Sequence, residues 1–228
     1  MTKDFSTWRP CDEPRPAALT GRFVRLEAFS KNRHAQRLFE NIAGPDDDNL
    51  WRYIPLPKPA DAAALGDVFT FMGGLANNPW RVLAIIDPET DYVLGTASYM
   101  RIRPDHGSAE VGCVIFSKKI QKTPAATEAM FLMAKHLFDD LGYRRYEWKC
   151  HNGNDASKRA AERLGFSFEG VFRNDMIVKG ENRDTAWYSI IDSEWPPVKA
   201  GLQAWLAPEN FDEQGVQRTS LAALRPQH

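Results

Sequence analysis

The stretch from Glu110 to Leu141, EVGCVIFSKKIQKTPAATEAMFLMAKHLFDDL, decides the fold. It opens with an apolar run over residues 110–116, which is typical of a buried strand. A basic loop follows, and Thr123 with Pro124 then predicts a helix start, because Thr is a good N-cap and Pro suits the first helical position. Apolar residues recur at helical spacing as far as Leu141. The stretch therefore predicts a strand, a loop and a helix in succession.

A unit of this kind can bind an anion, because the first turn of a helix offers free backbone N–H groups and the positive end of the helix dipole. Small side chains at Ala125 and Ala126 would let a diphosphate approach the backbone, and Lys118, Lys119 and Lys122 would add positive charge. The alternative is that lysines merely solvate the loop of an ordinary α/β unit. Spacing alone leaves both interpretations open.

Two motifs resemble those of a known family, one in the basic loop and one further along the chain. Gln121-Lys-Thr-Pro-Ala-Ala126 resembles the Gln/Arg-x-x-Gly-x-Gly/Ala signature of the GCN5-related N-acetyltransferases (GNAT), and the Ala-Thr-Glu-Ala that follows is similar to the branch that acetylates the N-termini of ribosomal proteins. Asn154-Asp-Ala-Ser157 and Arg163-Leu-Gly-Phe166 resemble the second motif. The likeness extends loosely over residues 21–195. It implies an α/β fold with a mixed, largely antiparallel sheet, a parallel splayed pair of strands and helices on both faces.

The resemblance implies that acetyl-CoA is the co-substrate. The sequence has no constellation of metal ligands, so no metal is expected. Backbone N–H groups of Val114 to Phe116 would polarise the thioester carbonyl, and Asn154 would bond the pantetheine arm. Pro124 replaces the middle glycine of the signature, so one amide donor is missing and neighbouring residues must hold the diphosphate. The implied cofactor-binding residues are Val114, Ile115, Phe116, Gln121, Lys122, Thr123, Ala125, Ala126, Thr127, Asn154 and Ser157.

Two residues are candidates for catalysis. Glu110, at the start of a buried strand, could take the proton of the amine if burial raises its pKa, and it resembles the base of histone-type family members. The alternative is a strand-end residue or an ion pair with an arginine. Ser157 would protonate the departing sulfur, since the tyrosine that many members use is Ala161 here; the alternative for both Asn154 and Ser157 is helix capping.

The acceptor side is less determined. Trp51 and Tyr53, in a proline-rich loop, are candidate walls of the substrate cleft, although packing beneath the loop is the alternative. Together with the acidic run Asp46 to Asp48 they would suit a basic peptide or a small cationic amine. The aspartates lack the ligand spacing of a cation loop, so a solvated turn is the favoured interpretation of that run.

Composition limits the remaining choices. The 228 residues carry 29 basic and 30 acidic side chains, so no overall basic field indicates nucleic acid or an anionic membrane as partner. The three cysteines, Cys11, Cys113 and Cys150, lack metal-ligand spacing and are expected to be free thiols. We find no signal sequence and no long apolar span, so a cytoplasmic location is expected.

The expected organisation is an extended arm over residues 1–20, one N-acetyltransferase domain over residues 21–195, and a tail over residues 196–228 with a short helix. The predicted activity is acetyl transfer from acetyl-CoA to a primary amine, either a small molecule or a peptide N-terminus, by direct attack. A homodimer is compatible with the resemblance. The alternative, motivated by Pro124 and Ala161, is a catalytically silent acyl-CoA-binding or protein-interaction module of the same fold.

Overall fold

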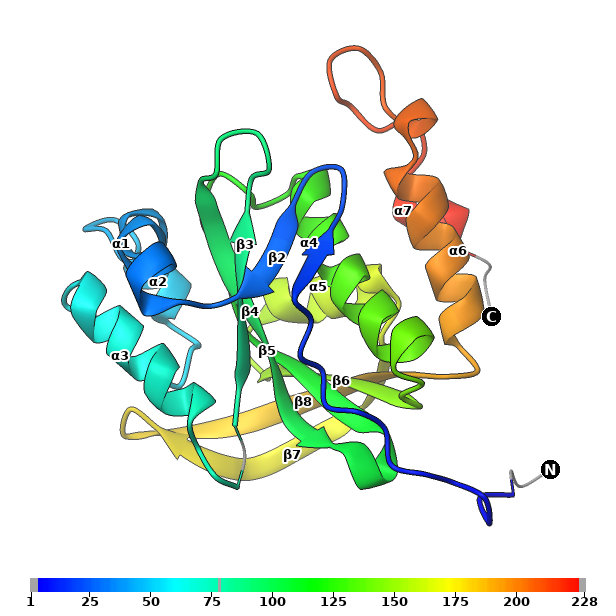
Figure 1. Ribbon diagram of the computed structural model, residues 1–228, viewed down its shortest axis with the longest axis horizontal. Helices are drawn as coiled ribbons and strands as arrows, with labels where there is room; N and C mark the ends of the chain where they lie inside the picture. Colours follow the sequence, from blue (N-terminus) through cyan, green and yellow to red (C-terminus); the bar gives the residue numbers. More distant parts are fainter. Residues whose placement is uncertain (1–3, 78, 226–228) are drawn as a thin grey trace.

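The computed structural model describes residues 4–77 and 79–225, and its framework is one eight-stranded sheet (Figure 1). The strand order is β1-β2-β3-β4-β5-β6-β8-β7. All neighbouring strands are antiparallel except β5 and β6, which are parallel. The predicted α/β class with a mixed, largely antiparallel sheet is therefore confirmed. The strands are β1 (Ala18–Thr20), β2 (Arg25–Ala28), β3 (Arg81–Ile86), β4 (Val93–Arg103), β5 (Ser108–Phe116), β6 (Arg145–His151), β7 (Ser167–Val178) and β8 (Glu181–Ile191).

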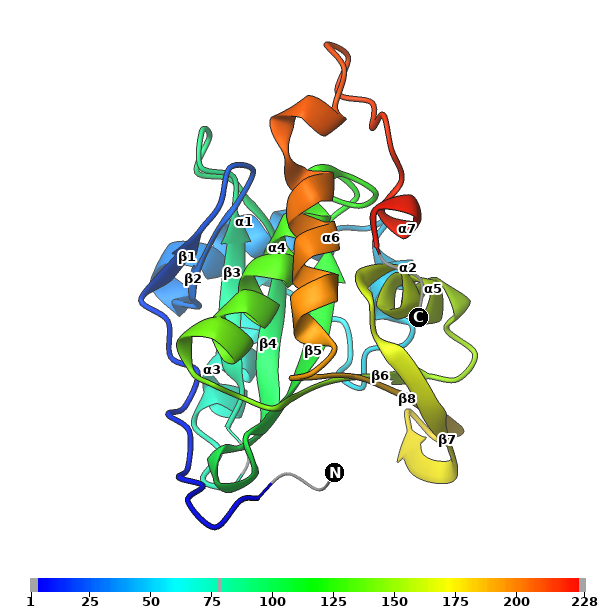
Figure 2. The same cartoon turned by 90° about the vertical axis from the view of Figure 1, so that its right-hand side faces the viewer.

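Helices cover both faces of the sheet, as Figures 1 and 2 show. One group lies over β3 and β4 and consists of α1 (Lys31–Ile42), α2 (Asp48–Trp51) and α3 (Ala62–Gly73). The opposite face carries α4 (Pro124–Lys135) and α5 (Asp155–Leu164), and α6 (Trp195–Leu206) packs against α4. Shorter elements are η1 (Pro104–His106), η2 (His136–Asp140), η3 (Pro208–Asn210) and α7 (Leu221–Leu224). Each group of helices encloses its own apolar core against the sheet.

The strand, loop and helix predicted from the central stretch are all present. Thr123 is the N-cap of α4 in an extended conformation, and Pro124 occupies the first helical position. The helix differs from the expectation at its far end, because α-helical geometry stops at Lys135 and continues as the π-helical turn η2 to Asp140. The turn still buries Leu137 and Phe138, so the apolar residues beyond Lys135 face the core as a longer helix would have placed them.

Other boundaries shift from the sequence expectation in similar ways. Alternating apolar and polar residues over 21–28 predict a strand, but the strand begins only at Arg25, and the stretch assigned to the arm contains β1, which pairs with β2. Apolar runs over residues 166–172 and 184–191 predict a final hairpin, and the observed one is longer, with β7 reaching Val178 and β8 starting at Glu181. In the tail, α6 buries Trp205, which fits the short helix expected there. Residues 1–3 and 226–228 of the arm and tail lie outside the described residues.

A buried carboxylate ties α4 to the start of β2. The side chain of Glu128 is on α4 and accepts hydrogen bonds from the backbone N–H groups of Arg22, Phe23 and Val24, at 2.8, 2.6 and 2.9 Å. A Cβ on Gly21 would lie 2.3 Å from the Glu128 carboxyl carbon, so only glycine leaves room for this contact. At this bend the three N–H groups bond the carboxylate and not a neighbouring strand.

We expect Glu128→Ala to lower the free energy of unfolding by about 3–5 kcal/mol, because it leaves buried N–H donors without an acceptor. Urea unfolding would measure the change. Glu40→Ala is the matched control, since Glu40 lies on exposed α1 surface and accepts a hydrogen bond from the exposed Gln36 side chain. A loss below about 1 kcal/mol for Glu128→Ala would contradict the interpretation.

Candidate active site

Glu110 lies on β5, on the sheet face opposite α4. The residues on either side of it, Ala109 and Val111, are buried in the core that α4 covers, so strand alternation turns Glu110 the other way. Its Oε2 atom is 2.9 Å from Lys149 Nζ and 3.7 Å from Arg101 Nε. Burial raises the pKa of the Glu110 carboxyl above its usual value, although the adjacent Lys149 ammonium acts in the opposite direction. The features expected of a base and of an ion pair thus coexist here.

A cluster of charges surrounds Glu110 that the sequence interpretation missed. Glu147 on β6 is opposite Glu110 in the parallel register and pairs with Arg103 at 2.7 Å and Arg145 at 2.8 Å. The Trp187 ring lies beneath two cations, with Arg101 5.0 Å and Lys149 4.8 Å from its centroid. A signal was available, because alternation in Tyr-Glu-Trp-Lys places Glu147 and Lys149 on one face of β6.

The parallel pair β5–β6 separates just beyond Glu110. Pairing runs from Ser108 opposite Arg145 to Val111 opposite Trp148 and stops there. From Gly112 to Phe116, β5 pairs with β4 alone. β5 bulges here, because its two residues Cys113 and Val114 lie opposite the single residue Ala97 of β4. Cys113 has a positive φ of 47° in this bulge. The predicted residues Val114, Ile115 and Phe116 therefore lie where β5 has no partner on its β6 side.

Neither cysteine near this gap has the character of a nucleophile. Burial raises the pKa of the Cys113 thiol to about 12, and burial also raises that of Cys150. Both remain protonated thiols at neutral pH and pack among apolar side chains, which agrees with the expectation of free thiols.

The three lysines of the loop before α4 have different surroundings. Lys118 donates to the Asp46 carbonyl at 3.0 Å and lies 3.3 Å from Asp47 Oδ1, while Lys119 lies over the Tyr92 ring. Lys122 is exposed, with a positive φ of 61°. Among the three loop lysines, Lys122 is therefore the best placed to meet an anion at the start of α4.

The first turn of α4 has backbone donors to offer. The Thr123 hydroxyl donates to the Ile120 carbonyl at 2.6 Å and does not cap the helix, so it does not occupy the N–H groups of Ala125 and Ala126. The Gln121 side chain donates to the Phe116 carbonyl at 2.8 Å. Thr127 is buried and accepts a hydrogen bond from Arg163 at 2.9 Å, so its side chain already has a partner.

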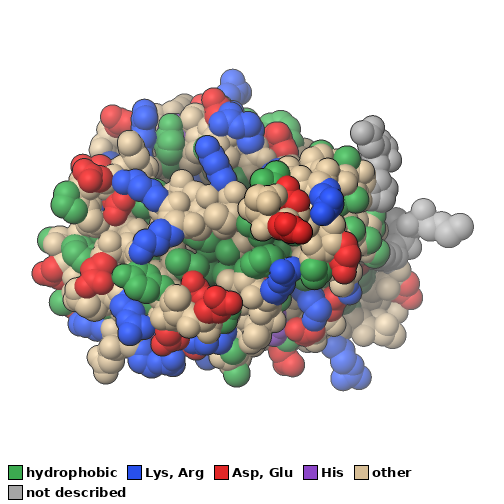
Figure 3. Space-filling model, turned by 90° about the horizontal axis from the view of Figure 1, so that it is seen from above, with side chains coloured by type: hydrophobic (Ala, Val, Ile, Leu, Met, Phe, Trp, Pro, Cys, Tyr) green, Lys and Arg blue, Asp and Glu red, His purple; other side chains and the backbone are tan. Residues whose placement is uncertain are grey.

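This end of the molecule is hollowed. Figure 3 looks down on the end where β5 stops and α4 begins, and hydrophobic side chains gather in a recess near its centre with both basic and acidic side chains around it. An apolar recess with cations at its rim can hold a ligand that has an apolar arm and a phosphate group.

Asn154 and Ser157 both take part in the start of α5. Asn154 Oδ1 accepts a hydrogen bond from the Ser157 backbone N–H at 3.1 Å, which is helix capping, and the amide nitrogen of its side chain is left for other partners. The Trp148 indole donates to Ser157 Oγ at 3.0 Å. Trp148 occupies an acceptor position of that oxygen, which leaves the hydroxyl hydrogen to be donated. Its present partner is the Cys150 thiol, whose pKa burial raises and the hydrogen bond from Ser157 lowers.

The two predicted substrate residues differ in position. Trp51 is buried with 2% of its surface exposed, and its indole donates to the Ile42 carbonyl at 2.6 Å, so it packs beneath the loop. Tyr53 is half-buried, donates to the Gly153 carbonyl at 3.0 Å and packs against His151. In the acidic run, Asp47 pairs with Lys118 and Asp48 with Lys58. Those two charges are already neutralised by lysines.

Tyr53 lines a pocket of about 320 Å³. Three segments enclose it: the residues after α2, the end of β6 at His151, and the tip of the β7–β8 hairpin. His151 is two residues beyond Lys149 on the same face of β6, so the pocket lies roughly 7 Å further along the strand from the partner of Glu110.

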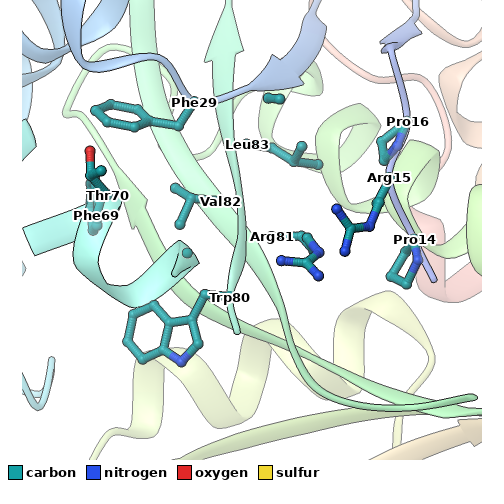
Figure 4. Close-up of a pocket in the computed structure, with 12 residues that line it drawn as sticks. Pro14, Arg15, Pro16, Phe29, Phe69, Thr70, Trp80, Arg81, Val82 and Leu83 are labelled. Carbon is teal, nitrogen blue, oxygen red and sulfur yellow. The ribbon is translucent and has the colours of Figure 1, made fainter. Parts of the chain in front are cut away.

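A second pocket, of about 410 Å³, lies at another edge of the sheet (Figure 4). Phe69, Trp80 and Val82 form its apolar wall, and Arg15 and Arg81 lie on the side of the N-terminal arm. Both arginines pair with Glu13. None of the predicted site residues lines this pocket.

Residues 24–167 match the family model described as an acetyltransferase (GNAT) domain. The chain belongs to the GNAT acetyltransferase family. A GCN5-related N-acetyltransferase from Brucella melitensis is similar in structure, with 43% identity, a TM-score of 0.91, and 96% of this chain and 98% of that chain covered. A GNAT-family acetyltransferase structure from Chromobacterium violaceum has 36% identity and a TM-score of 0.79, with 86% and 96% covered.

Two proteins that are similar in sequence are also described as N-acetyltransferases. An uncharacterized N-acetyltransferase, p20, of Bacillus licheniformis is 26% identical over 150 residues, which is 65% of this chain and 84% of that protein. YdaF of Bacillus subtilis, described as a candidate ribosomal N-acetyltransferase, is 31% identical over 91 residues, or 40% of this chain and 49% of that protein. The predicted resemblance to the GNAT family is confirmed, and the protein is an N-acetyltransferase by family.

The described residues lack two kinds of feature. No helix there is long and apolar enough to cross a membrane, and no group of His, Cys, Asp or Glu side chains there has the arrangement of a metal site.

Within this GNAT domain, the predicted residues fall into two neighbourhoods. The predicted cofactor residues line the gap after Val111 or lie at the starts of α4 and α5, and Glu110 immediately precedes the gap. Tyr53 belongs to the pocket at the end of β6, and Trp51 lies in the core. Most of the pocket residues that sequence reasoning missed come from the β7–β8 hairpin, where no motif marks them.

Proposed function

We propose that this GNAT protein transfers the acetyl group of acetyl-CoA to a primary amine by direct attack. The observation that carries the proposal is the separation of β5 from β6 after Val111, which leaves the backbone of residues 112–116 unpaired on one side. A peptide-like pantetheine arm can pair with such an edge as an added strand does. The gap ends at the first turn of α4, whose amides face the place where a diphosphate would lie.

The chain's residues fit this ligand despite Pro124. Proline at the first helical position removes a donor, while the N–H groups of Ala125 and Ala126 remain and Lys122 supplies charge nearby. We assign Gln121, Lys122, Thr123 and the backbone of Ala125 to Thr127 to the diphosphate. Val114, Ile115, Phe116 and Asn154 are assigned to the pantetheine arm and the thioester carbonyl.

The transfer needs two proton movements. The amine nitrogen forms a bond to the thioester carbonyl carbon, and the carbon–sulfur bond breaks. Glu110 accepts the proton that the amine loses, directly or through a water molecule, which its raised pKa favours. Ser157 donates its hydroxyl proton to the departing thiolate and is reprotonated from solvent. Backbone N–H groups at Val114 to Phe116 stabilise the negative charge on the carbonyl oxygen.

Incubation of the purified protein with acetyl-CoA and a panel of primary amines tests the proposal. The panel includes peptides with a free N-terminus, because the relative YdaF is described as a candidate ribosomal N-acetyltransferase. We expect free CoA thiol to appear together with an acetylated amine seen by mass spectrometry. Binding of acetyl-CoA without transfer to any amine would refute the catalytic role and favour the silent-module alternative.

A further inference from the structure

The pocket that Tyr53 lines has an unusual distribution of charge. Three cationic side chains line it, Arg52, Lys179 and Arg183, against one carboxylate, that of Glu181. His151 on the pocket wall accepts a hydrogen bond from the Gly153 N–H through Nδ1. The lining therefore carries an excess of positive charge on the acceptor side of the sheet.

Arg183 is the most informative of these side chains. Only 9% of its surface is exposed, and its Nε donates to Thr185 Oγ1 at 3.3 Å. Among the described residues, no carboxylate forms an ion pair with it. A largely covered side chain whose guanidinium forms no ion pair among the described residues keeps hydrogen-bond donors and a positive charge available to a ligand in the pocket. Its planar fork of donors suits a carboxylate or a phosphate.

The other two cations of the pocket, Lys179 and Arg52, are positioned by the turn and the loop that carry them and by their own contacts. Lys179 and Gly180 both have positive φ, at 53° and 81°, in the tight turn between β7 and β8. Lys179 Nζ donates to the Trp51 carbonyl at 2.7 Å, which ties the hairpin tip to α2. Arg52 is exposed and lies over the Tyr53 ring at 5.2 Å. Their positions are therefore set by the fold of the enclosing segments.

We propose that this pocket recognises an anionic group, a carboxylate or a phosphate, on the acceptor amine, with Arg183 as its main partner. The inference rests on the proposed acetyl transfer, since it names the class of amine for the same site. Lys149 and His151 follow one another on the same face of β6, so an acceptor anchored at Arg183 extends along this face toward Glu110. This differs from the basic peptide or cationic amine suggested by the aspartate run, whose charges Lys118 and Lys58 offset.

Calorimetric titration with matched pairs of amines tests the inference independently of turnover. One pair is β-alanine and β-alaninamide, and the other is O-phosphoethanolamine and ethanolamine; each is titrated into the full chain with and without CoA. We expect the anionic member to bind at least about tenfold more tightly in at least one pair. The pair with the larger preference identifies the anion as carboxylate or phosphate.

Arg183→Gln is expected to abolish that preference, whereas the matched control Arg218→Gln, in an exposed loop of the tail, keeps it. If Arg183→Gln does not fold, the exposed double variant Arg52→Gln with Lys179→Gln must reduce the preference several-fold. Equal or tighter binding of the neutral members, or a preference that a folded Arg183→Gln or the double variant leaves unchanged, overturns the inference.

The two proposals fail separately. Acetyl transfer to amines without any preference for an anionic group would overturn this inference and leave the proposed function standing. An anion preference that depends on Arg183, in a protein that acetylates no amine, would support the pocket assignment and refute the proposed function.

Discussion

Glu110→Gln is expected to lower kcat/KM for acetyl transfer by about 10²- to 10⁴-fold, the usual contribution of a general base. The side chain keeps its size and loses its capacity to take a proton from the amine. In the unmodified protein, activity should fall as the pH drops through the pKa of Glu110, since the protonated carboxyl cannot act as a base. Because burial raises that pKa, this midpoint should lie above the ordinary glutamate value of about 4.3.

Glu147→Gln is the matched control for this variant. Glu147 is also buried and ion-paired on the same face of the sheet, with Arg103 and Arg145 as its nearest partners, and its Oε2 atom lies 3.7 Å from the Arg101 Nε that Glu110 also approaches. We expect the variant to retain activity within about tenfold. Burial still raises the pKa of Glu110 in this variant, but the smaller contribution of the Glu147 charge is lost, so the acidic limb should remain with its midpoint at a lower pH. If Glu110→Gln had activity within about threefold of the unmodified protein, Glu110 would be a structural ion-pair residue only.

Ala125→Asp should weaken acetyl-CoA binding by about 100-fold, or roughly 2.7 kcal/mol. The new carboxylate would lie in the first turn of α4, where it repels a diphosphate while its interaction with the helix dipole favours the fold. Calorimetry measures the affinity, and a melting temperature that stays level or rises shows that the helix is intact.

Ala125→Asn separates charge from size in that experiment. Asparagine is as large as aspartate and uncharged, so we expect a loss of less than about tenfold. Equal losses for both variants would mean that bulk alone disturbs the site. Unchanged affinity in Ala125→Asp would show that the diphosphate does not lie at the start of α4.

The sequence predicted the elements that local rules determine. Thr123 with Pro124 marked the start of α4, because the fixed φ of proline suits the first helical position whatever surrounds it. Helix capping, the alternative interpretation of Asn154, is what the start of α5 shows. The gap after Val111 came from the family resemblance, since no residue pattern states where two parallel strands stop pairing.

Long-range contacts were beyond the sequence interpretation. The link from Glu128 to the N–H groups before β2 joins segments more than 100 residues apart, and nothing in either segment indicates the other. The ion pair of Lys149 with Glu110 depends on the register of β5 against β6. Trp51 could equally have faced a substrate, and only tertiary packing places it in the core.

Hydrogen–deuterium exchange with and without acetyl-CoA tests the central claim most directly, because it reports where the ligand covers backbone amides. We predict new protection at residues 112–116 of β5 and at residues 121–127 around the start of α4, with no change at the pocket lined by Phe69 and Trp80. Absence of protection in both segments at saturating acetyl-CoA, or protection confined to that other pocket, would contradict the account.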